Sequence, residues 1–394
     1  MPVSAVRVRD LEEAEAALFL AAAAEHEVVL PGGSVSREAQ RFLFLFAGEV
    51  ATRRLKTTVG PERLSLARLR AREAALGEDD SRTMLAEYRF ECEDLERIVR
   101  LFAVPDDVRT NGGHHFPAGE ELVLLLLRRM VSADSNTHLA FETGRSESAI
   151  SEGFNWMMEY LVTRFPDHFT EEAFFMFEHR FADFADGFAS LGIPVDNCVM
   201  LFDGKLWETC RPTRGQRDCY NGHHKLHGVK GHGNTFPNGI LPSAHFNSHG
   251  RTHDMTVLRQ SGILDHLAEA SQRSPAAAAD PDWRAGADAG YAPHPHCTPM
   301  FPGHTVAALG VLHALFNSDY APGRVTAEWG FRKIVALWPY VEFAKLKLLR
   351  QNVGLILPVG VFLTNIHTCI HGDAISNATG VAPPELEDYL AGNV

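Results

Sequence analysis

Three acidic residues stand at positions where a metal-dependent reaction would need them. Asp203 directly follows the apolar run 199–202, and Asp288 ends a second short segment that is flanked by glycine. Glu328 shares a helical face with apolar residues spaced 3, 4 and 3 apart, which turns it toward the core. Buried carboxylates repel one another, and a bound divalent cation is the natural compensation. Two such ions about 4 Å apart can cleave a phosphodiester bond.

Each of these residues also has a simpler interpretation. An Asp at the end of a strand is usually a turn or cap residue, and a single inward-facing Glu usually pairs with an Arg. Asp254 poses the same choice, since it adds a fourth acid near the metals or, like Thr252, caps the helix that follows. The joint arrangement of the three carboxylates favours the metal site.

The elements that must position these carboxylates follow from hydrophobic periodicity. The continuous apolar run 199–202 is typical of a strand buried on both faces. The low-complexity stretch 274–282 predicts a surface loop. The remaining pattern predicts two strands joined by a turn, then a helix, a strand and a helix, at 225–233, 240–247, 254–267, 283–288 and 324–338. This order indicates an α/β or α+β catalytic domain.

The region before these strands is predicted to be helical from about Thr83 to Phe165. Its clearest amphipathic stripe consists of Ile150, Phe154, Met157, Met158 and Leu161. The Gly-containing turn 143–146 before this stripe is compatible with a helix-turn-helix, in which Arg145 and Ser146 are candidate DNA contacts. Any αα-hairpin produces the same spacing, and the acidic residues of the second helix disfavour its insertion into a DNA groove.

The first 82 residues lack the periodicity of a packed domain and predict an N-terminal extension. Within it, the segment 53–72 holds seven basic residues against one acidic residue. Such a segment can bind phosphates or serve as a nuclear import signal, and a solvated helix face explains it equally well.

The composition is that of a soluble globular protein. The 394 residues are 45% hydrophobic and 22% charged, and the formal net charge is −13. These values exclude collagenous and disordered classes, and they disfavour a protein that coats nucleic acid by bulk charge. The apolar stretches 16–24 and 353–363 are shorter than the roughly 20 residues that span a bilayer. Six scattered cysteines without a CxxC pair predict reduced thiols in an intracellular protein.

A local excess of positive charge accompanies Asp203. The window 203–260 holds eight basic residues against four acidic ones. A basic strip beside an acidic metal site would hold phosphate near the cations, although a solvated strand edge would carry the same charges. The candidate DNA contacts in this strip are Lys205, Arg211, Arg214, Lys225 and Lys230.

Histidine and cysteine support a weaker zinc hypothesis. Structural zinc sites use tight ligand pairs, and the separation of Cys210 from Cys219 is too wide for one. The two candidate groups are Cys210, Cys219, His223 and His224, and His294, His296 and Cys297.

Five segments, taken in chain order, resemble the DDE superfamily endonuclease pattern of Harbinger-type transposases and their domesticated relatives. They are Phe202–Gly204, Tyr220–Lys225, Ser248–Asp254, Ala287–Tyr291 and Val325–Phe331. The spacings between the three carboxylates suit that family, and the tail from Leu363 to Cys369 resembles that of its members. The resemblance extends from about residue 83 to the C-terminus.

The resemblance implies an α/β protein with an RNase H-like catalytic domain at 190–394, a mixed sheet with flanking helices and a loop insertion near 272–282. An all-α helix-turn-helix region at 83–180 would precede it. Asp203, Asp288 and Glu328 would form the catalytic and metal-binding triad, and we add Asp254 as a secondary metal ligand. The implied cofactor is Mg²⁺ or Mn²⁺, as two ions, and the implied reaction is cleavage and joining of DNA at transposon ends.

The same resemblance implies DNA as a partner, a Myb-like DNA-binding partner protein, a homo-oligomer, no membrane, and the nucleus of a eukaryotic cell as the location. Two positions depart from the family pattern, because Trp329 stands where a basic residue is common and Lys205 where a small hydroxyl residue is usual. The main alternative is a domesticated, catalytically inactive DNA- or protein-binding factor, and a zinc hydrolase is a third hypothesis. The retention of three mutually repelling acids favours the enzyme.

Overall fold

A computed structural model describes most of the chain from residue 63 onward. The described residues are 63–76, 78–132, 135–242, 244–273, 282–342, 346–348 and 351–394. Apart from 141–144, they belong to one compact unit, 63–140 and 145–394. Half of the predicted basic segment 53–72 therefore lies outside the described residues, as do most of the predicted loop 274–282 and most of the predicted N-terminal extension.

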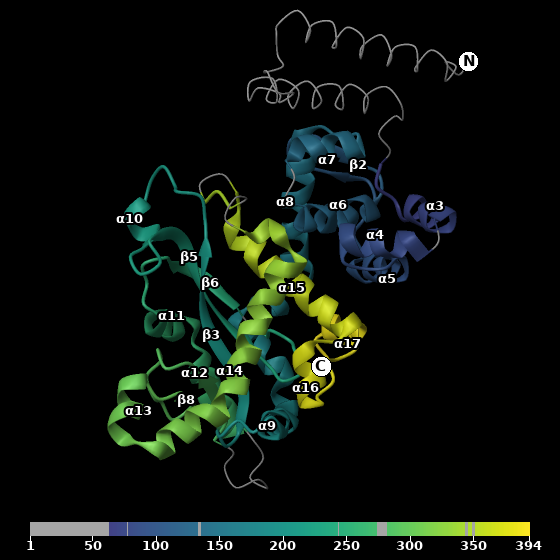
Figure 1. Ribbon diagram of the computed structural model, residues 1–394. Coiled ribbons are helices and arrows are strands. Elements are labelled where there is room, and N and C mark those ends of the chain that lie inside the picture. Colours follow the sequence, from purple (N-terminus) through teal and green to yellow (C-terminus); the bar gives the residue numbers. More distant parts are fainter. Residues whose placement is uncertain are drawn as a thin grey trace, which may run out of the picture. The chain divides into compact units, whose positions relative to one another are not determined.

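The first half of the described chain is helical (Figure 1), which confirms the helical pattern predicted from about Thr83 to Phe165; the helices also extend to both sides of that range. Its helices are α3 (Leu66–Leu76), α4 (Glu78–Tyr88), α5 (Cys92–Phe102), α6 (Gly119–Val131), α7 (Asn136–Thr143), α8 (Glu147–Arg164), the 3₁₀ helices η1 (Pro166–Phe169) and η2 (Glu171–Arg180), and α9 (Phe181–Ser190). A short antiparallel pair, β1 (Val108–Arg109) and β2 (His115–Phe116), lies between α5 and α6.

Helix α8 confirms the predicted amphipathic stripe. Its buried residues include Ile150, Phe154, Met157, Met158 and Leu161. One of its acidic residues is used within the fold, since the Glu152 carboxylate accepts hydrogen bonds from Thr110 Oγ1 and Gly112 N at 2.6 and 2.9 Å. Helices α7 and α8 are consecutive, and the helix-turn-helix assignment stays a prediction.

The second half contains a six-stranded mixed sheet, so the predicted mixed α/β class is present. Its strands are β3 (Cys198–Glu208), β4 (Tyr220–Asn221), β5 (Leu226–Thr235), β6 (Ala244–His249), β7 (Arg284–Ala287) and β8 (Cys297–Pro299). Strands β3, β5 and β6 are antiparallel neighbours, whereas β7 and β8 run parallel to β3. The turn between β5 and β6 uses Gly239 at φ +79°, as the sequence 237–239 predicts.

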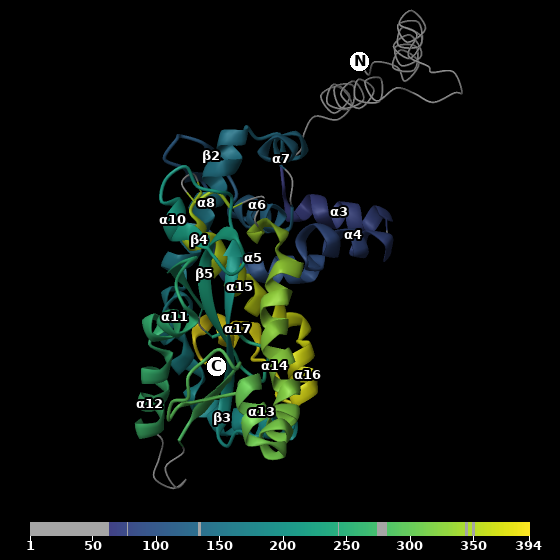
Figure 2. The same ribbon diagram turned by 60° about the vertical axis from the view of Figure 1, so that its left-hand side comes forward.

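The helices of this half are α10 (Gln216–Cys219), α11 (Asp254–Ser261), α12 (Ile263–Arg273), α13 (Gly303–Leu309), α14 (Val311–Leu337), η3 (Pro339–Val341), α15 (Val353–His371), α16 (Ala374–Thr379) and α17 (Leu386–Ala391). Figures 1 and 2 show α11 and α12 on one side of the sheet and α14 on the other. The sequence predicts one helix at 254–267, whereas the structure has two helices, α11 and α12, in this region, so that prediction is wrong. Gly262 adopts φ +67° and ends α11, because a left-handed residue cannot continue a helix.

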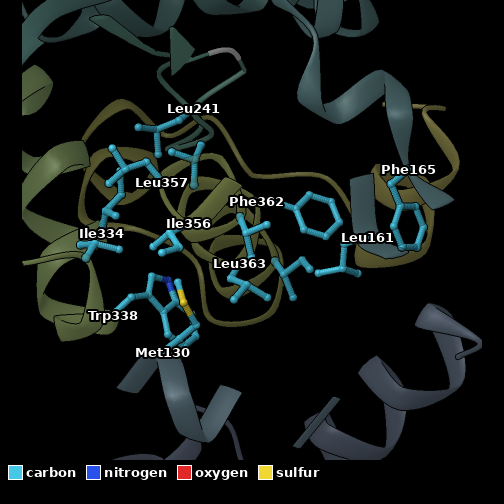
Figure 3. Close-up of a cluster of buried hydrophobic side chains, with 14 of the residues drawn as sticks. Met130, Leu161, Phe165, Leu241, Ile334, Trp338, Ile356, Leu357, Phe362 and Leu363 are labelled. Carbon is cyan, nitrogen blue, oxygen red and sulfur yellow. The ribbon is translucent and has the colours of Figure 1, made fainter. Parts of the chain in front are cut away.

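Helix α15 is the main core helix of this unit (Figure 3). Phe362 and Leu363 are buried beside Leu161 of α8 and Phe165, which directly follows that helix. Ile356 lies near Trp338 and Met130. The apolar stretch is longer than the predicted 353–363, because the helix continues through Pro358 to His371. Its length and hydropathy would suit a membrane span, but 67% of its most apolar window is buried inside the protein, which is the environment of a core helix.

Polar groups on α15 hold this core to the sheet region. Asn365 is 2% exposed; its side chain accepts a hydrogen bond from Leu241 N at 2.9 Å and donates one to Leu241 O at 2.8 Å. Thr364 Oγ1 accepts a hydrogen bond from the indole nitrogen of Trp338 at 3.0 Å. These contacts satisfy backbone and indole groups that water cannot reach.

We predict that Asn365→Ala lowers the free energy of unfolding by about 2–4 kcal/mol, because both backbone groups of Leu241 lose their partner. Urea titration followed by circular dichroism measures the change. Asn155→Ala is the matched control, since that amide bonds only within its own helix, to Ser151 O. Equal effects of the two substitutions would contradict the prediction.

A second prediction concerns acid. Burial, helped by the charges of Lys333, His371 and Arg89, lowers the pKa of His367 from 6.5 to about 3. Below pH 6.5 the unfolded chain therefore binds a proton that the folded chain does not, so stability falls as the pH falls. His367→Leu should reduce the stability lost between pH 7 and pH 5 by about 1–2 kcal/mol. An equal loss of stability in the wild-type and His367→Leu proteins would contradict the prediction.

Candidate catalytic site

Strand β3 is the element that brings the predicted carboxylates together. Along one edge it pairs with β5, which places Asp203 opposite Gly233. Along the other edge it pairs with β7 in parallel, with Leu201 opposite Gly286. The same register continued by two residues sets Asp203 beside Asp288 on the same face of the sheet.

A small cavity confirms this proximity of two predicted residues. It has a volume of about 10 Å³ and is lined by Asp203, Asp288 and Tyr320 together with residues of β3 and β7. Asp203 Oδ1 accepts a hydrogen bond from Gly204 N at 2.8 Å, and Asp288 Oδ1 accepts one from Gly290 N at 2.9 Å. These bonds fix the direction of both carboxylates.

The position of Asp203 within its strand differs from the prediction. The sequence predicts that the strand ends at Phe202, whereas β3 continues to Glu208. The reason is pairing, since β5 forms an antiparallel ladder with β3 as far as the pair Glu208 and Gly228. Asp203 therefore projects from the middle of a central strand.

Glu328, the third predicted acid, lies on α14, the helix that packs against β3. Leu201 of β3 contacts this helix, because a Cβ on Gly323 would lie 3.6 Å from the Leu201 side chain. The Glu328 side chain is 33% exposed and forms an ion pair of 3.5 Å with Arg332, one turn further on. Within the described ranges, no three His, Cys, Asp or Glu side chains are placed so as to hold a metal ion.

Asp254 is not among the residues that line this cavity. The expected cap by Thr252 or Asp254 is wrong, because the N-cap of α11 is His253, whose Nδ1 accepts the Met255 N–H at 3.3 Å. Asp254 instead forms a 2.8 Å ion pair with Lys230, whose side chain is 12% exposed. Lys230, a predicted DNA contact, therefore holds a carboxylate of the protein.

The approach of Asp254 to the sheet requires a glycine in β3. A Cβ on Gly204 would lie 2.6 Å from Asp254 Oδ1 and 2.9 Å from the hydroxyl of Tyr291. Since successive residues of a strand face opposite sides, Gly204 and Asp203 present opposite faces of β3. Asp254 thus reaches the site from the α11 side, while α14 covers the other side (Figure 2).

Tyr291 is a site residue that the sequence reasoning quoted in a motif but gave no role. It is 6% exposed, and its buried hydroxyl has no hydrogen-bond partner among the described residues. Burial, followed by the charges of Asp254, Asp203 and Asp288, raises its pKa far above the usual value. The hydroxyl therefore keeps its proton, and it lies 2.9 Å from the position that a Cβ on Gly204 would occupy, next to Asp254 Oδ1 at 2.6 Å from the same position. Its place three residues after Asp288 was the available signal.

His232 of β5 was also missed. It lies opposite Gly204, is 1% exposed, and its ring is 4.8 Å from that of Phe202. Neither ring nitrogen has a hydrogen-bond partner among the described residues. Burial lowers its pKa to about 3, aided by His245 and opposed by Asp254, so the ring is neutral near pH 7. The window 203–260 holds seven histidines, and their spacing along the sequence gave no signal that set His232 apart from the others.

The remaining predicted DNA contacts fall into different environments. Lys205 lies 4.5 Å from the Trp207 ring centre, and burial lowers its pKa. Arg145 is buried in an ion pair with Glu121, with side chains 8% and 4% exposed, so it offers no open group to DNA. Ser146 is the N-cap of α8 and accepts the Ala149 N–H at 3.1 Å. Exposed positions are occupied by Arg211, Arg214 and Lys225.

The donors at the cavity suit a hard divalent cation. Asp203 and Asp288 are both among the residues that line a space of about 10 Å³, the size that one water or one ion requires. Mg²⁺ is commonly held by one or two carboxylates, with substrate phosphates completing its coordination. On donor chemistry, these two residues fit the metal that the sequence predicts.

Comparison with known proteins agrees with this geometry. Residues 202–365 match the family described as DDE superfamily endonuclease. The match is a little under half of the chain and includes Asp203, Asp254, Asp288 and Glu328. This segment is thus similar to DDE superfamily endonucleases. No curated protein and no solved structure matches the chain significantly.

We predict that Gly204→Ala destabilises the protein by about 1–3 kcal/mol, because the new methyl group meets Asp254 and Tyr291. The cost should shrink in an Asp254→Ala background, and a double-mutant cycle by chemical denaturation measures this coupling. Gly222→Ala is the control, since a Cβ there meets nothing within 4 Å. A Gly204→Ala protein as stable as the Gly222→Ala protein would be inconsistent with the described packing.

Proposed function

We propose that this protein is a divalent-metal-dependent DNA endonuclease of the transposase type, which cleaves and joins phosphodiester bonds at the ends of a mobile element. The observation that carries the proposal is the pair Asp203 and Asp288. Asp203 lies on β3, Asp288 directly follows the parallel neighbour β7, and both line one ion-sized cavity within the segment that matches DDE superfamily endonucleases. Pairs of carboxylates next to phosphate are the usual setting of Mg²⁺-dependent phosphoryl transfer.

Asp203 and Asp288 would hold Mg²⁺ or Mn²⁺, and we propose Glu328 as the third ligand. Bound there, the metal would activate the attacking water or 3′ hydroxyl and stabilise the leaving oxygen. Glu328 lies on α14, the helix that packs on β3. Its ion-pair partner Arg332 is 73% exposed, so solvent screens the attraction between the two charges and the ion pair is weak. Metal binding would therefore require Glu328 to separate from Arg332.

The surrounding residues orient these carboxylates and the substrate. Gly204 N and Gly290 N fix one oxygen of each aspartate. Tyr291 keeps its proton beside Asp254, while Lys205 places a cation beside Asp203. The exposed cations Arg211, Arg214 and Lys225 would contact phosphates further along the DNA.

The finer identity is part of the proposal. The sequence motifs support a Harbinger-type transposase or a relative of one, located in the nucleus if the organism is eukaryotic. Because Arg145 is buried against Glu121, we propose that sequence reading is performed with help from a Myb-like partner protein or a second copy of the chain.

One observation favours a second candidate, a transposase-derived DNA- or protein-binding factor without activity. Within the part of the chain that the structure describes, the three acids do not converge as a metal-holding group, and Glu328 is paired with Arg332. Metal binding separates the two candidates, because an inactive factor has no use for the cation.

We predict that Mg²⁺ or Mn²⁺ stabilises the protein by about 2.7 kcal/mol at a hundred times its Kd, and that Asp203→Asn and Asp288→Asn remove this effect. The same variants, and Glu328→Gln, should abolish nicking of supercoiled plasmid DNA while the fold is kept. Differential scanning fluorimetry and gel electrophoresis provide the two readouts.

Asp196→Asn, at an exposed position just before β3, is the matched control and should keep both properties. Indifference of the wild-type protein to both metals would favour the inactive factor. Residual nicking by one of the three variants at the wild-type rate would remove that residue from the triad.

A further inference from the structure

A second pocket opens beside Asp254 and Tyr291, between α11, α12 and the loop after Tyr291. Its volume is about 270 Å³. The floor is apolar, with Leu258 only 1% exposed and Met255 and Leu264 partly buried beside it. Ala292 and Pro293, both exposed, form the opposite wall.

The two walls of this pocket start at residues of the site. Met255 directly follows Asp254, and Ala292 directly follows Tyr291. A hydrogen bond of 3.2 Å from Ala292 N to Met255 Sδ joins the walls. Consecutive Cα atoms are about 3.8 Å apart, so the pocket begins one residue step from the two side chains that face Gly204.

The rim carries charges that suit a nucleotide. Arg259 is exposed at the rim and makes no ion pair with any residue that the structure describes. Asp265 and His294 complete the polar edge, and His294 Nδ1 accepts the His296 N–H at 3.2 Å. A flat apolar interior with a thioether, bordered by a cation and by hydrogen-bonding groups, matches a base ring with its polar edges and the phosphate attached to it.

Building on the proposed function, we propose that this pocket receives one unstacked nucleobase of the DNA strand that lies at the carboxylates. Arg259 binds the phosphate of that nucleotide, and Met255, Leu258 and Leu264 contact the base. Holding one base outside the stack fixes the register of the strand relative to Asp203 and Asp288. The pocket is therefore a positioning and specificity site for DNA.

The test is photo-cross-linking, which needs no cleavage. The full-length Asp288→Asn protein is irradiated with a short single-stranded oligothymidylate that carries one iodouracil base, and the cross-linked peptides are identified by mass spectrometry. Cross-links should map to residues 255–265 and 292–294. Leu264→Trp fills the pocket and should lower this cross-linking about tenfold, the effect of losing one base contact.

Leu312→Trp is the matched control, because Leu312 is 78% exposed on α14, and it should leave the cross-link yield unchanged. Arg259→Ala should weaken binding of the same oligonucleotide without altering the thermal midpoint, which keeps the test valid if Leu264→Trp disturbs the fold. Cross-links confined to other surfaces, or equal yields from the two tryptophan variants, would overturn the proposal. Cross-links in the pocket together with a wild-type protein that cuts no DNA would support the pocket and contradict the nuclease.

Discussion

The register of β3 against its two neighbours is the constraint on which the site depends. Because β3 pairs with β5 along one edge and with β7 along the other, the side chain of Asp203 has one direction available to it. The parallel register with β7 then brings Asp288 to the same cavity. A shift of one residue would turn Asp203 to the opposite face, so the pairing determines whether the two acids can share a cation.

Helices α14 and α11 lie on opposite faces of the sheet and bring different acids toward β3. On one face, α14 contacts Leu201 and carries Glu328. On the other, α11 brings Asp254 against Gly204, where the Lys230 cation offsets its charge. Taking a carboxylate out of water is costly unless a cation or hydrogen-bond donor accompanies it, which explains why Asp254 arrives already paired. The tail motif around Asn365 serves the core rather than the chemistry, since its amide binds the backbone of Leu241.

The sequence predicted much of the fold because its strongest signals are local. Short stretches of the sequence determine the buried stripe of α8, the apolar start of β3 and the turn at Gly239. The predictions were wrong where contacts with a distant segment, or a backbone angle, determine the local structure. Strand β3 runs past Asp203 because β5 supplies a ladder, and Gly262 divides a predicted helix through a backbone angle that hydrophobic spacing does not record.

The sequence alone determined which acids to consider, the order of helices and strands, and the resemblance to DDE endonucleases. Only the tertiary structure decided that Asp203 and Asp288 line one cavity, that Arg145 is enclosed with Glu121, and that the buried Tyr291 hydroxyl has no hydrogen-bond partner among the described residues. The physical reason is the separation along the sequence over which each effect acts. Periodicity acts within a few residues, whereas register, burial and charge pairing depend on segments that meet only when the chain is folded.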